Sequence, residues 1–231
     1  MIQERSSTVD WEKDIYEKGL QLNHWPYTEV ISDILNATNG SDRRALRLLE
    51  IGCGAGNNLW FAAEAGFKVY GLDSSPTAIK YASARLWKMG HKEVDLRVGS
   101  LTSLPWPENF FDIVLDRGAL TQNSYSAIRV CLREVHRVLR PHVGRLLAYT
   151  LYGLDHEDRK YGIEVSRNTY DHFSDGYFKG VGLTSFFSAE SLSELFVDFD
   201  QITIKRYLSE NLSNRLRTES YSISCRKKDS L

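Results

Sequence analysis

The sequence is poor in cysteine and proline, has almost no net charge and contains no long apolar run. Its three cysteines, Cys53, Cys131 and Cys225, are far apart and form no C-x-x-C pair. This pattern argues against both a disulfide framework and a zinc site. No stretch of about 18 apolar residues is long enough to cross a bilayer, and the first residues lack the apolar core of a signal peptide. We therefore expect a soluble cytoplasmic protein without a metal or a membrane partner.

The charge balance narrows the range of partners. The chain carries 29 Lys and Arg against 30 Asp and Glu, a formal net charge of -1. Such a balance gives no overall basic field that would attract nucleic acid. The basic residues 226–228 are best explained as part of a solvated tail. With 231 residues, 42% of them hydrophobic, the chain can bury one sizeable core. We expect a single domain spanning 1–231, as a monomer or homodimer, with no nucleic-acid partner.

Short apolar runs alternate with longer segments of helical period. The clearest helix is 124–139, in which Ile128, Leu132 and Val135 recur at intervals of three and four residues. Alternation of strand and helix predicts a parallel, doubly wound α/β sheet with helices on both faces. The predicted strands are 46–51, 68–72, 94–98, 111–115 and 144–150.

Three regions depart from this alternation. In the last third, Ser188 can cap a helix, and the alternating runs 201–207 and 220–226 predict two antiparallel strands at one edge of the sheet. The N-terminal segment 1–40 predicts a helical arm. Residues 151–183 show no sustained period, so we expect an inserted substrate loop, either a functional lid or a disordered excursion.

The segment 46–56, LRLLEIGCGAG, is the most informative part of the chain. An apolar strand runs directly into Gly52, Gly54 and Gly56, which let the backbone turn sharply and approach a ligand closely. The helix that follows presents unpaired N–H groups. Asp73 ends the second strand, where its carboxylate can accept hydrogen bonds from both hydroxyls of a ribose. Together these features predict a nucleotide-sized site.

The spacing of the glycines discriminates between cofactors. The dinucleotide fingerprint G-x-G-x-x-G requires glycine at position 57, where this chain has Asn57. The pattern is instead E-x-G-x-G-x-G from Glu50, which resembles motif I of the class I S-adenosylmethionine-dependent methyltransferases. A nicotinamide-dependent oxidoreductase and a non-catalytic S-adenosylmethionine-binding module of the same fold stay open as alternatives.

The resemblance extends over about residues 45–150. It includes Asp73 as the ribose acid, FFDIVLDRGAL at 110–120 and REVHRVLRP at 133–141. It implies a Rossmann-like fold with seven strands, mostly parallel, and S-adenosylmethionine as the cofactor, released as S-adenosylhomocysteine. The third strand is followed by Gly99 and Ser100, where the family often has an acid near adenine. The residues implied to contact the cofactor are Glu50, Gly52, Cys53, Gly54, Gly56, Asn57, Asn58, Asp73, Ser74, Ser100, Leu101, Thr102 and Asp116.

The acceptor side is less defined. The carboxyl ends of strands four and five face the cofactor's methyl in this fold, so Asp116 and Tyr149 are catalytic candidates and Arg117 and Tyr152 are substrate-binding candidates. Asp116 has an alternative role in bonding the cofactor's amino group or capping the next helix. The resemblance also implies an N-terminal helix over the cofactor, so the rings of Trp11, Tyr16, Trp25 and Tyr27 either form an aromatic cover or only pack the arm. Of these, Trp25 and Tyr27 are substrate-binding candidates. Weaker candidates, each better explained as a polar residue of a solvated loop, are His24, His156, His172, Arg159 and Arg167.

Two features favour a small-molecule acceptor. The run KGVGLTSFFSAESL at 179–192 resembles the entry to the penultimate helix of small-molecule methyltransferases. The loop LDRGAL after strand four lacks the N-P-P-Y tetrad expected for protein or DNA amide methylation, and the length leaves little room for an RNA-binding module. We expect methyl transfer to an oxygen or nitrogen of a small molecule.

Overall fold

The computed structural model describes residues 7–228, and its centre is a seven-stranded sheet in the order β3-β2-β1-β4-β5-β10-β9. Strands β1 to β5 are parallel, whereas β10 runs antiparallel to both of its neighbours. This confirms the predicted fold class. The bounds are β1 Arg47–Ile51, β2 Lys68–Asp73, β3 Asp95–Val98, β4 Ile113–Arg117, β5 Arg145–Tyr152, β9 Phe199–Glu210 and β10 Arg217–Lys227.

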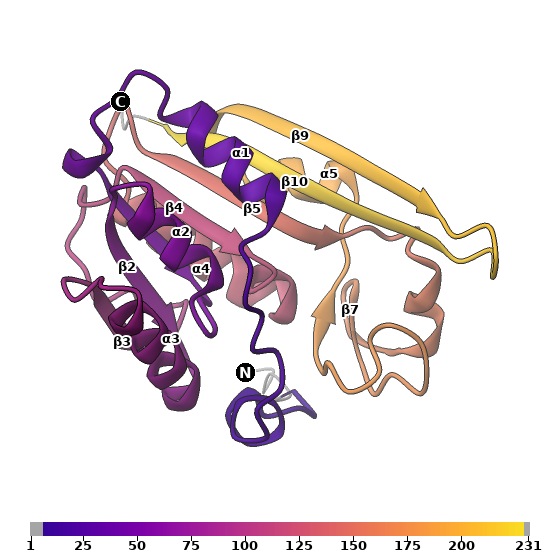
Figure 1. Ribbon diagram of the computed structural model, residues 1–231. Coiled ribbons are helices and arrows are strands. Elements are labelled where there is room, and N and C mark those ends of the chain that lie inside the picture. The colour runs from indigo at the N-terminus through magenta and orange to yellow at the C-terminus, as the bar shows by residue number, and fades with distance from the viewer. Residues whose placement is uncertain (1–6, 229–231) are drawn as a thin grey trace.

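Helices cover both faces of the sheet (Figure 1). One buried cluster joins α4 and α5 to the sheet, and a second joins α1, α2 and α3 to its other face. The bounds are α1 Thr28–Ala37, α2 Asn57–Glu64, α3 Pro76–Lys88, α4 Tyr125–Val138 and α5 Ala189–Leu195, with short helices η1 Trp11–Tyr16, η2 Arg43–Ala45, η3 Leu120–Gln122 and η4 Glu157–Tyr161. Within residues 7–228, no helix has the length and apolar character needed to span a membrane.

The predicted helices and strands of the main sheet are present with shifted ends. Helix α4 begins one residue later than predicted, because Ser124 is its N-cap: the Ser124 hydroxyl accepts from the backbone N–H of Ala127. Strand β4 begins two residues later than expected, because Phe111 forms an isolated bridge with Leu139 instead. The capping box at the start of α5 joins Ser188 to Ser191. Both C-terminal strands are longer than their alternating runs.

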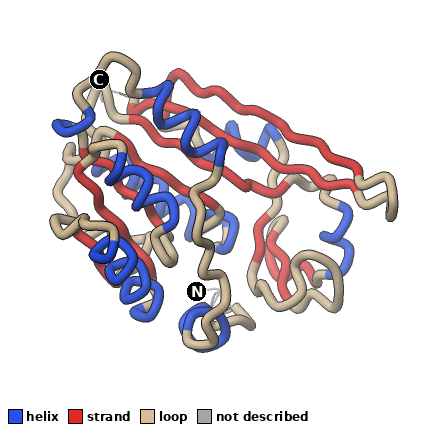
Figure 2. The backbone as a smooth tube through the Cα atoms, viewed as in Figure 1, coloured by secondary structure: helices blue, strands red, loops and turns tan. Residues whose placement is uncertain are grey.

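The segment after β5 is more ordered than the sequence predicts. It contains η4 and a three-stranded sheet of β6 Ile163–Ser166, β7 Thr169–Asp171 and β8 Thr184–Ser185 (Figure 2). These strands are too short to show a period in the sequence. Their core is a buried aromatic cluster around Phe178 and Phe186, whose rings lie 5.1 Å apart. The segment 151–183, predicted as an inserted substrate loop, thus contains regular structure that aromatic packing rather than periodicity orders.

Candidate active site

The turn between β1 and α2 is built from glycines with left-handed backbone. Gly52, Gly54 and Gly56 have φ values of 64°, 52° and 74°, which L side chains rarely adopt. A Cβ on Gly52 would overlap the Cβ of Ala119 in the loop after β4. The backbone N–H of Cys53 donates to the Leu72 carbonyl, at 2.9 Å. The loop is thus pressed between the ends of β2 and β4, at the carboxyl edge of the sheet.

Asp73 fastens this loop to the end of β2. Its Oδ2 accepts from the Gly54 N–H at 2.8 Å, and its Oδ1 accepts from the Ser75 N–H at 2.9 Å. Burial raises the pKa of the Asp73 carboxyl, while the backbone donors of Ser75 and Gly54 act in the opposite direction. Each carboxylate oxygen has a second lone pair that can accept another hydrogen bond. The side chain can therefore bind a hydroxylated ligand without releasing the loop.

Glu50 lies beneath the same loop and is only 2% exposed. The Asn58 amide donates to its Oε1 at 2.7 Å, whereas its Oε2 is buried without a partner among the described residues. Burial raises the pKa of the carboxyl to about 8. A buried oxygen without a hydrogen-bond donor lowers the stability of the folded protein unless a ligand supplies that donor. This oxygen fits a ligand that presents a hydrogen-bond donor to the floor of the site.

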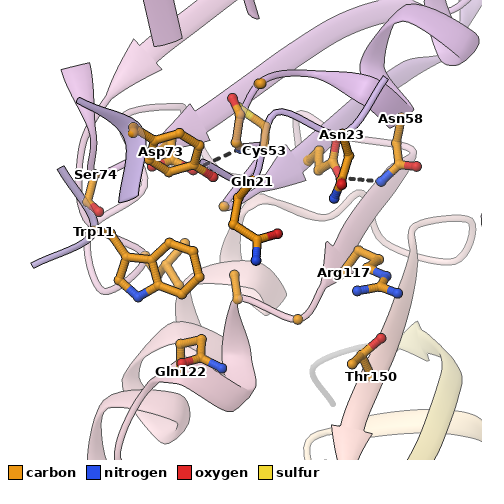
Figure 3. Close-up of a pocket in the computed structure, with 18 of the residues that line it drawn as sticks. Trp11, Gln21, Asn23, Cys53, Asn58, Asp73, Ser74, Arg117, Gln122 and Thr150 are labelled. Atoms are coloured by element: carbon orange, nitrogen blue, oxygen red, sulfur yellow. Dashed lines mark hydrogen bonds between the residues drawn. The ribbon is translucent and has the colours of Figure 1, made fainter. Parts of the chain in front are cut away.

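A cavity of about 580 Å³ opens beside the glycine turn, within the range of roughly 300–1,000 Å³ typical of small-ligand sites. Figure 3 shows its polar side chains pointing inward from several elements. The residues of the predicted cofactor set that line it are Glu50, Gly52, Cys53, Gly54, Asn57, Asn58, Asp73, Ser74, Ser100 and Leu101. Ten of the thirteen predicted cofactor residues are thus gathered at one cavity.

The N-terminal arm closes one side of the cavity. Trp11 and Tyr16 of η1 and Tyr27 before α1 line it. Glu12 accepts from the backbone N–H of Thr77 at 3.1 Å and from its hydroxyl at 2.7 Å, and also bonds the Ser75 hydroxyl, so η1 is attached to the start of α3. Trp25 is different: it is 71% exposed, packs on Trp60 and does not line the cavity. Its predicted substrate role is therefore not supported.

The arm also contacts the small sheet. The Thr8 N–H donates to Asp171 at 2.9 Å, and the Leu183 N–H donates to the Ser7 hydroxyl at 3.0 Å. Two flanking segments that fit no layer of the main sheet are thereby joined to each other. Together they form the outer walls of the cavity.

The far end of the cavity, away from Trp11 and Ser74, is lined by Arg117, Thr150, Tyr152 and Tyr177. The Arg117 guanidinium lies 3.5 Å above the centre of the Tyr27 ring. The Tyr152 hydroxyl donates to that of Tyr177 at 3.2 Å. Of the four predicted substrate-binding residues, the structure thus brings Tyr27, Arg117 and Tyr152 together at this end.

The two catalytic candidates lie outside the cavity. Asp116 has no exposed surface, and its Oδ1 accepts from the N–H groups of Ala119 and Leu120 at 3.0 Å each, so it holds the loop that leads into η3. Burial raises its pKa to about 7. The Tyr149 hydroxyl donates to Asp33 of α1 at 2.9 Å and is enclosed in the core between sheet and helix. Neither position supports a role in catalysis, and Asp116 does not contact the cavity as a cofactor residue either.

Other predicted residues have structural roles. Gly56 is the N-cap of α2, and a Cβ there would press on Ala82 of α3. The Thr102 N–H donates to the Ser100 hydroxyl at 3.2 Å without lining the cavity. His156 is buried in the aromatic cluster, where its ring lies 4.8 Å from Phe178. None of His24, His156 and His172 lines the cavity, and neither do Arg159 and Arg167.

Sequence reasoning missed part of the lining. Gln122 and Asn123 follow the LDRGAL loop after one intervening residue, so their place after β4 could have identified them. Tyr177 and Val181 could not be found in this way, because they come from the segment whose fold was not predicted. The other missed residues include Gln21, Asn23, Gly118, Ala119 and Thr150.

Comparison with known proteins agrees with this geometry. Residues 48–142 match a family model described as a methyltransferase domain. An uncharacterized methyltransferase YcgJ of Bacillus subtilis (strain 168) is 33% identical over 106 residues, which are 46% of this chain and 41% of that protein. The chain spans less than half the length of the curated relatives it matches, because between 40% and 49% of each is covered.

Solved structures extend the fold likeness over most of the chain. A SAM-dependent methyltransferase from Methanosarcina mazei gives a TM-score of 0.69 at 19% identity, covering 89% of this chain and 100% of that one. The 1,6-didemethyltoxoflavin-N1-methyltransferase of Burkholderia thailandensis, solved with 1,6-didemethyltoxoflavin and S-adenosylhomocysteine, gives 0.60 at 22% identity, covering 86% and 77%. These likenesses show the fold.

Proposed function

We propose that the protein is a class I S-adenosylmethionine-dependent methyltransferase that transfers a methyl group to an oxygen or nitrogen of a small molecule; the match of residues 48–142 to a methyltransferase-domain model supports this proposal. The observation that carries the proposal is the cavity: the glycine turn and Asp73 form one wall, and side chains from two flanking segments form the others. A small acceptor fits an enclosed site of this size better than a macromolecule.

The residues present fit the cofactor. Asp73 would accept from the ribose hydroxyls, and the orphaned Oε2 of Glu50 would accept from a donor at the methionine end. Ser100, Leu101 and Trp11 would surround the adenine. When bound, the cofactor supplies an activated methyl on a sulfonium, which leaves as a neutral sulfide.

The protein's own contribution is alignment and exclusion of water. The arm and the segment after β5 enclose the site, so an acceptor can be held in line with the methyl. No histidine among the described residues lines the cavity. The chemistry therefore suits an acceptor that needs no strong base, such as an unprotonated amine or an acidic hydroxyl.

The proposal is tested by incubating the protein with methyl-labelled S-adenosylmethionine and a panel of small amines and phenols. We expect labelled product with at least one acceptor, and loss of that product in the Asp73→Ala variant. If the cofactor binds yet no label is transferred to any acceptor or to water, the chain is a non-catalytic binding module. If the label appears instead on RNA or protein added to the mixture, the small-molecule assignment is wrong.

A further inference from the structure

The far end of the cavity holds a cation without a counter-ion. The Arg117 guanidinium makes no hydrogen bond and no ion pair with any of residues 7–228, and its Nε is buried without a partner. An arginine retains its charge at all physiological pH values and offers five donors. A buried, unpaired donor of this kind is expensive to maintain in the absence of a ligand.

The surroundings do not neutralise this cation. The carboxyls of Glu50 and Asp116 act on it electrostatically, but both are buried, and burial favours their protonated forms. Its other neighbour is the face of Tyr27, which orients the flat guanidinium but contributes no counter-charge. A negatively charged ligand is therefore needed to neutralise the positive charge of Arg117.

Arg117 also has neighbours that suit a flat organic molecule. Tyr27 lies on one side, and Tyr152 with Tyr177 lines the cavity beyond it. In Figure 3, Arg117 and Thr150 stand at the opposite end of the cavity from Trp11 and Ser74. This end is therefore distinct from the wall around Asp73.

We propose that the methyl acceptor is a small anionic molecule whose carboxylate or phosphate group pairs with Arg117, with its ring or chain held against Tyr27 and Tyr152. Arg117 then determines acceptor specificity: a planar guanidinium binds two oxygens of such a group at once, which a neutral analogue cannot reproduce. The inference rests on the proposed function, because it names the acceptor class of that same site.

The test uses the full chain saturated with S-adenosylhomocysteine and titrated calorimetrically with benzoate, phenyl phosphate and the neutral analogue benzamide. At least one anion is expected to bind about tenfold or more tightly than benzamide, as a charge-assisted contact implies. The preferred anion tells a carboxylate acceptor from a phosphate one. In Arg117→Gln the preference for the anion disappears. Arg117→Lys keeps the charge but loses the planar guanidinium that binds two oxygens at once, so it restores only part of the preference.

Two controls locate the effect. Arg44→Gln makes the same change at a side chain that is 86% exposed and lies outside the cavity, and it should leave the anion preference intact. The affinity of each variant for S-adenosylhomocysteine and for 5′-methylthioadenosine, which lacks the amino-acid end, is measured in parallel. Arg117→Gln should leave both affinities close to those of the wild type.

Three results would overturn the inference. Benzamide binding as tightly as the anions, or no anion binding at millimolar concentration, would show that Arg117 selects no acidic acceptor. Loss of S-adenosylhomocysteine affinity in Arg117→Gln with 5′-methylthioadenosine unaffected would assign Arg117 to the cofactor's own carboxylate. Failure of the wild type to bind S-adenosylhomocysteine at all would overturn the proposed function first and this inference with it.

Discussion

The two sides of the cavity are built in different ways. Around Gly52 and Asp73 the wall is backbone, held by left-handed turns and by main-chain N–H groups that bond a carboxylate. The opposite wall consists of side chains such as Tyr27, Arg117 and Tyr177, presented by the arm, the ends of strands and the segment after β5. A backbone wall tolerates little change in sequence, whereas a side-chain wall can be altered one residue at a time. The first suits a common cofactor, and the second suits a particular acceptor.

The largest effect should come from the backbone wall. Gly52→Ala should lower the free energy of unfolding by roughly 2 to 5 kcal/mol, since left-handed backbone costs an alanine about 1–2 and overpacking against Ala119 about 1–3 kcal/mol. Gly40→Ala is the matched control, because Gly40 also has a positive φ but has no atom near its would-be Cβ. Urea unfolding of both variants measures the difference. Equal losses would mean that the close approach of Ala119 is unimportant.

The next effect concerns ligand affinity at the same wall. Asp73→Ala should weaken S-adenosylhomocysteine binding by about 1.5–3 kcal/mol, on the order of 10- to 150-fold, because charged hydrogen-bond partners of the ribose are lost. Asp112→Ala is the control: Asp112 is equally buried and accepts from the Arg47 N–H at 2.9 Å. It should cost stability without changing affinity. If calorimetry gives the same S-adenosylhomocysteine affinity for Asp73→Ala and the wild type, Asp73 does not bind the ligand.

The residues around the glycine turn could largely be predicted from the sequence, because a short continuous stretch of chain determines their arrangement. Gly52 and Gly54 stand in the turn that follows the first strand, where the backbone needs a positive φ. Asp73 is the last residue of the next strand. Both places can be recognised from the local sequence. Asp116 and Tyr149 come from the predicted strands but lie outside the cavity, because a position at the end of a strand does not fix the direction of its side chain. Tyr177 and Val181 depend on a small sheet held by aromatic packing between distant residues, which no local pattern reveals.

The pH dependence of the free energy of unfolding should reveal the buried carboxyl of Glu50. The folded-state pKa of Glu50 is raised to about 8 from the ordinary value of 4.5, so the folded state holds the proton that the unfolded state has released. Stability is therefore greatest below about pH 4.5 for this group and falls as the pH rises towards 8, by at most about 1.4 kcal/mol per pH unit.

The measurement is urea unfolding of the ligand-free protein between pH 5.5 and 8. The decline should be shallower in Glu50→Gln. Glu134→Gln is the control, because its hydrogen-bonded pair with Arg137 lowers the pKa of Glu134, so its titration lies below this window. A decline of equal slope in wild type and Glu50→Gln would contradict a protonated Glu50.

The smallest effect should come from the attachment of the arm. Glu12→Ala removes the half-buried contacts with Ser75 and Thr77, which attach the arm and lie outside the main core, so global stability should change little. Limited proteolysis near residue 12 should accelerate, and S-adenosylhomocysteine affinity should fall severalfold because Trp11 and Tyr16 are held less firmly. Glu17→Ala, at an exposed position at the end of the same helix, should alter neither. Unchanged proteolysis in Glu12→Ala would show that other contacts hold the arm.

The most direct measurement is a calorimetric titration of the full chain with S-adenosylmethionine, S-adenosylhomocysteine and NADH. The glycine spacing that places Asn57 after Gly56, and the cavity around Asp73, require that both sulfur nucleotides bind and that NADH does not. Binding of NADH in their place would contradict this assignment of the site and support a dinucleotide-dependent oxidoreductase.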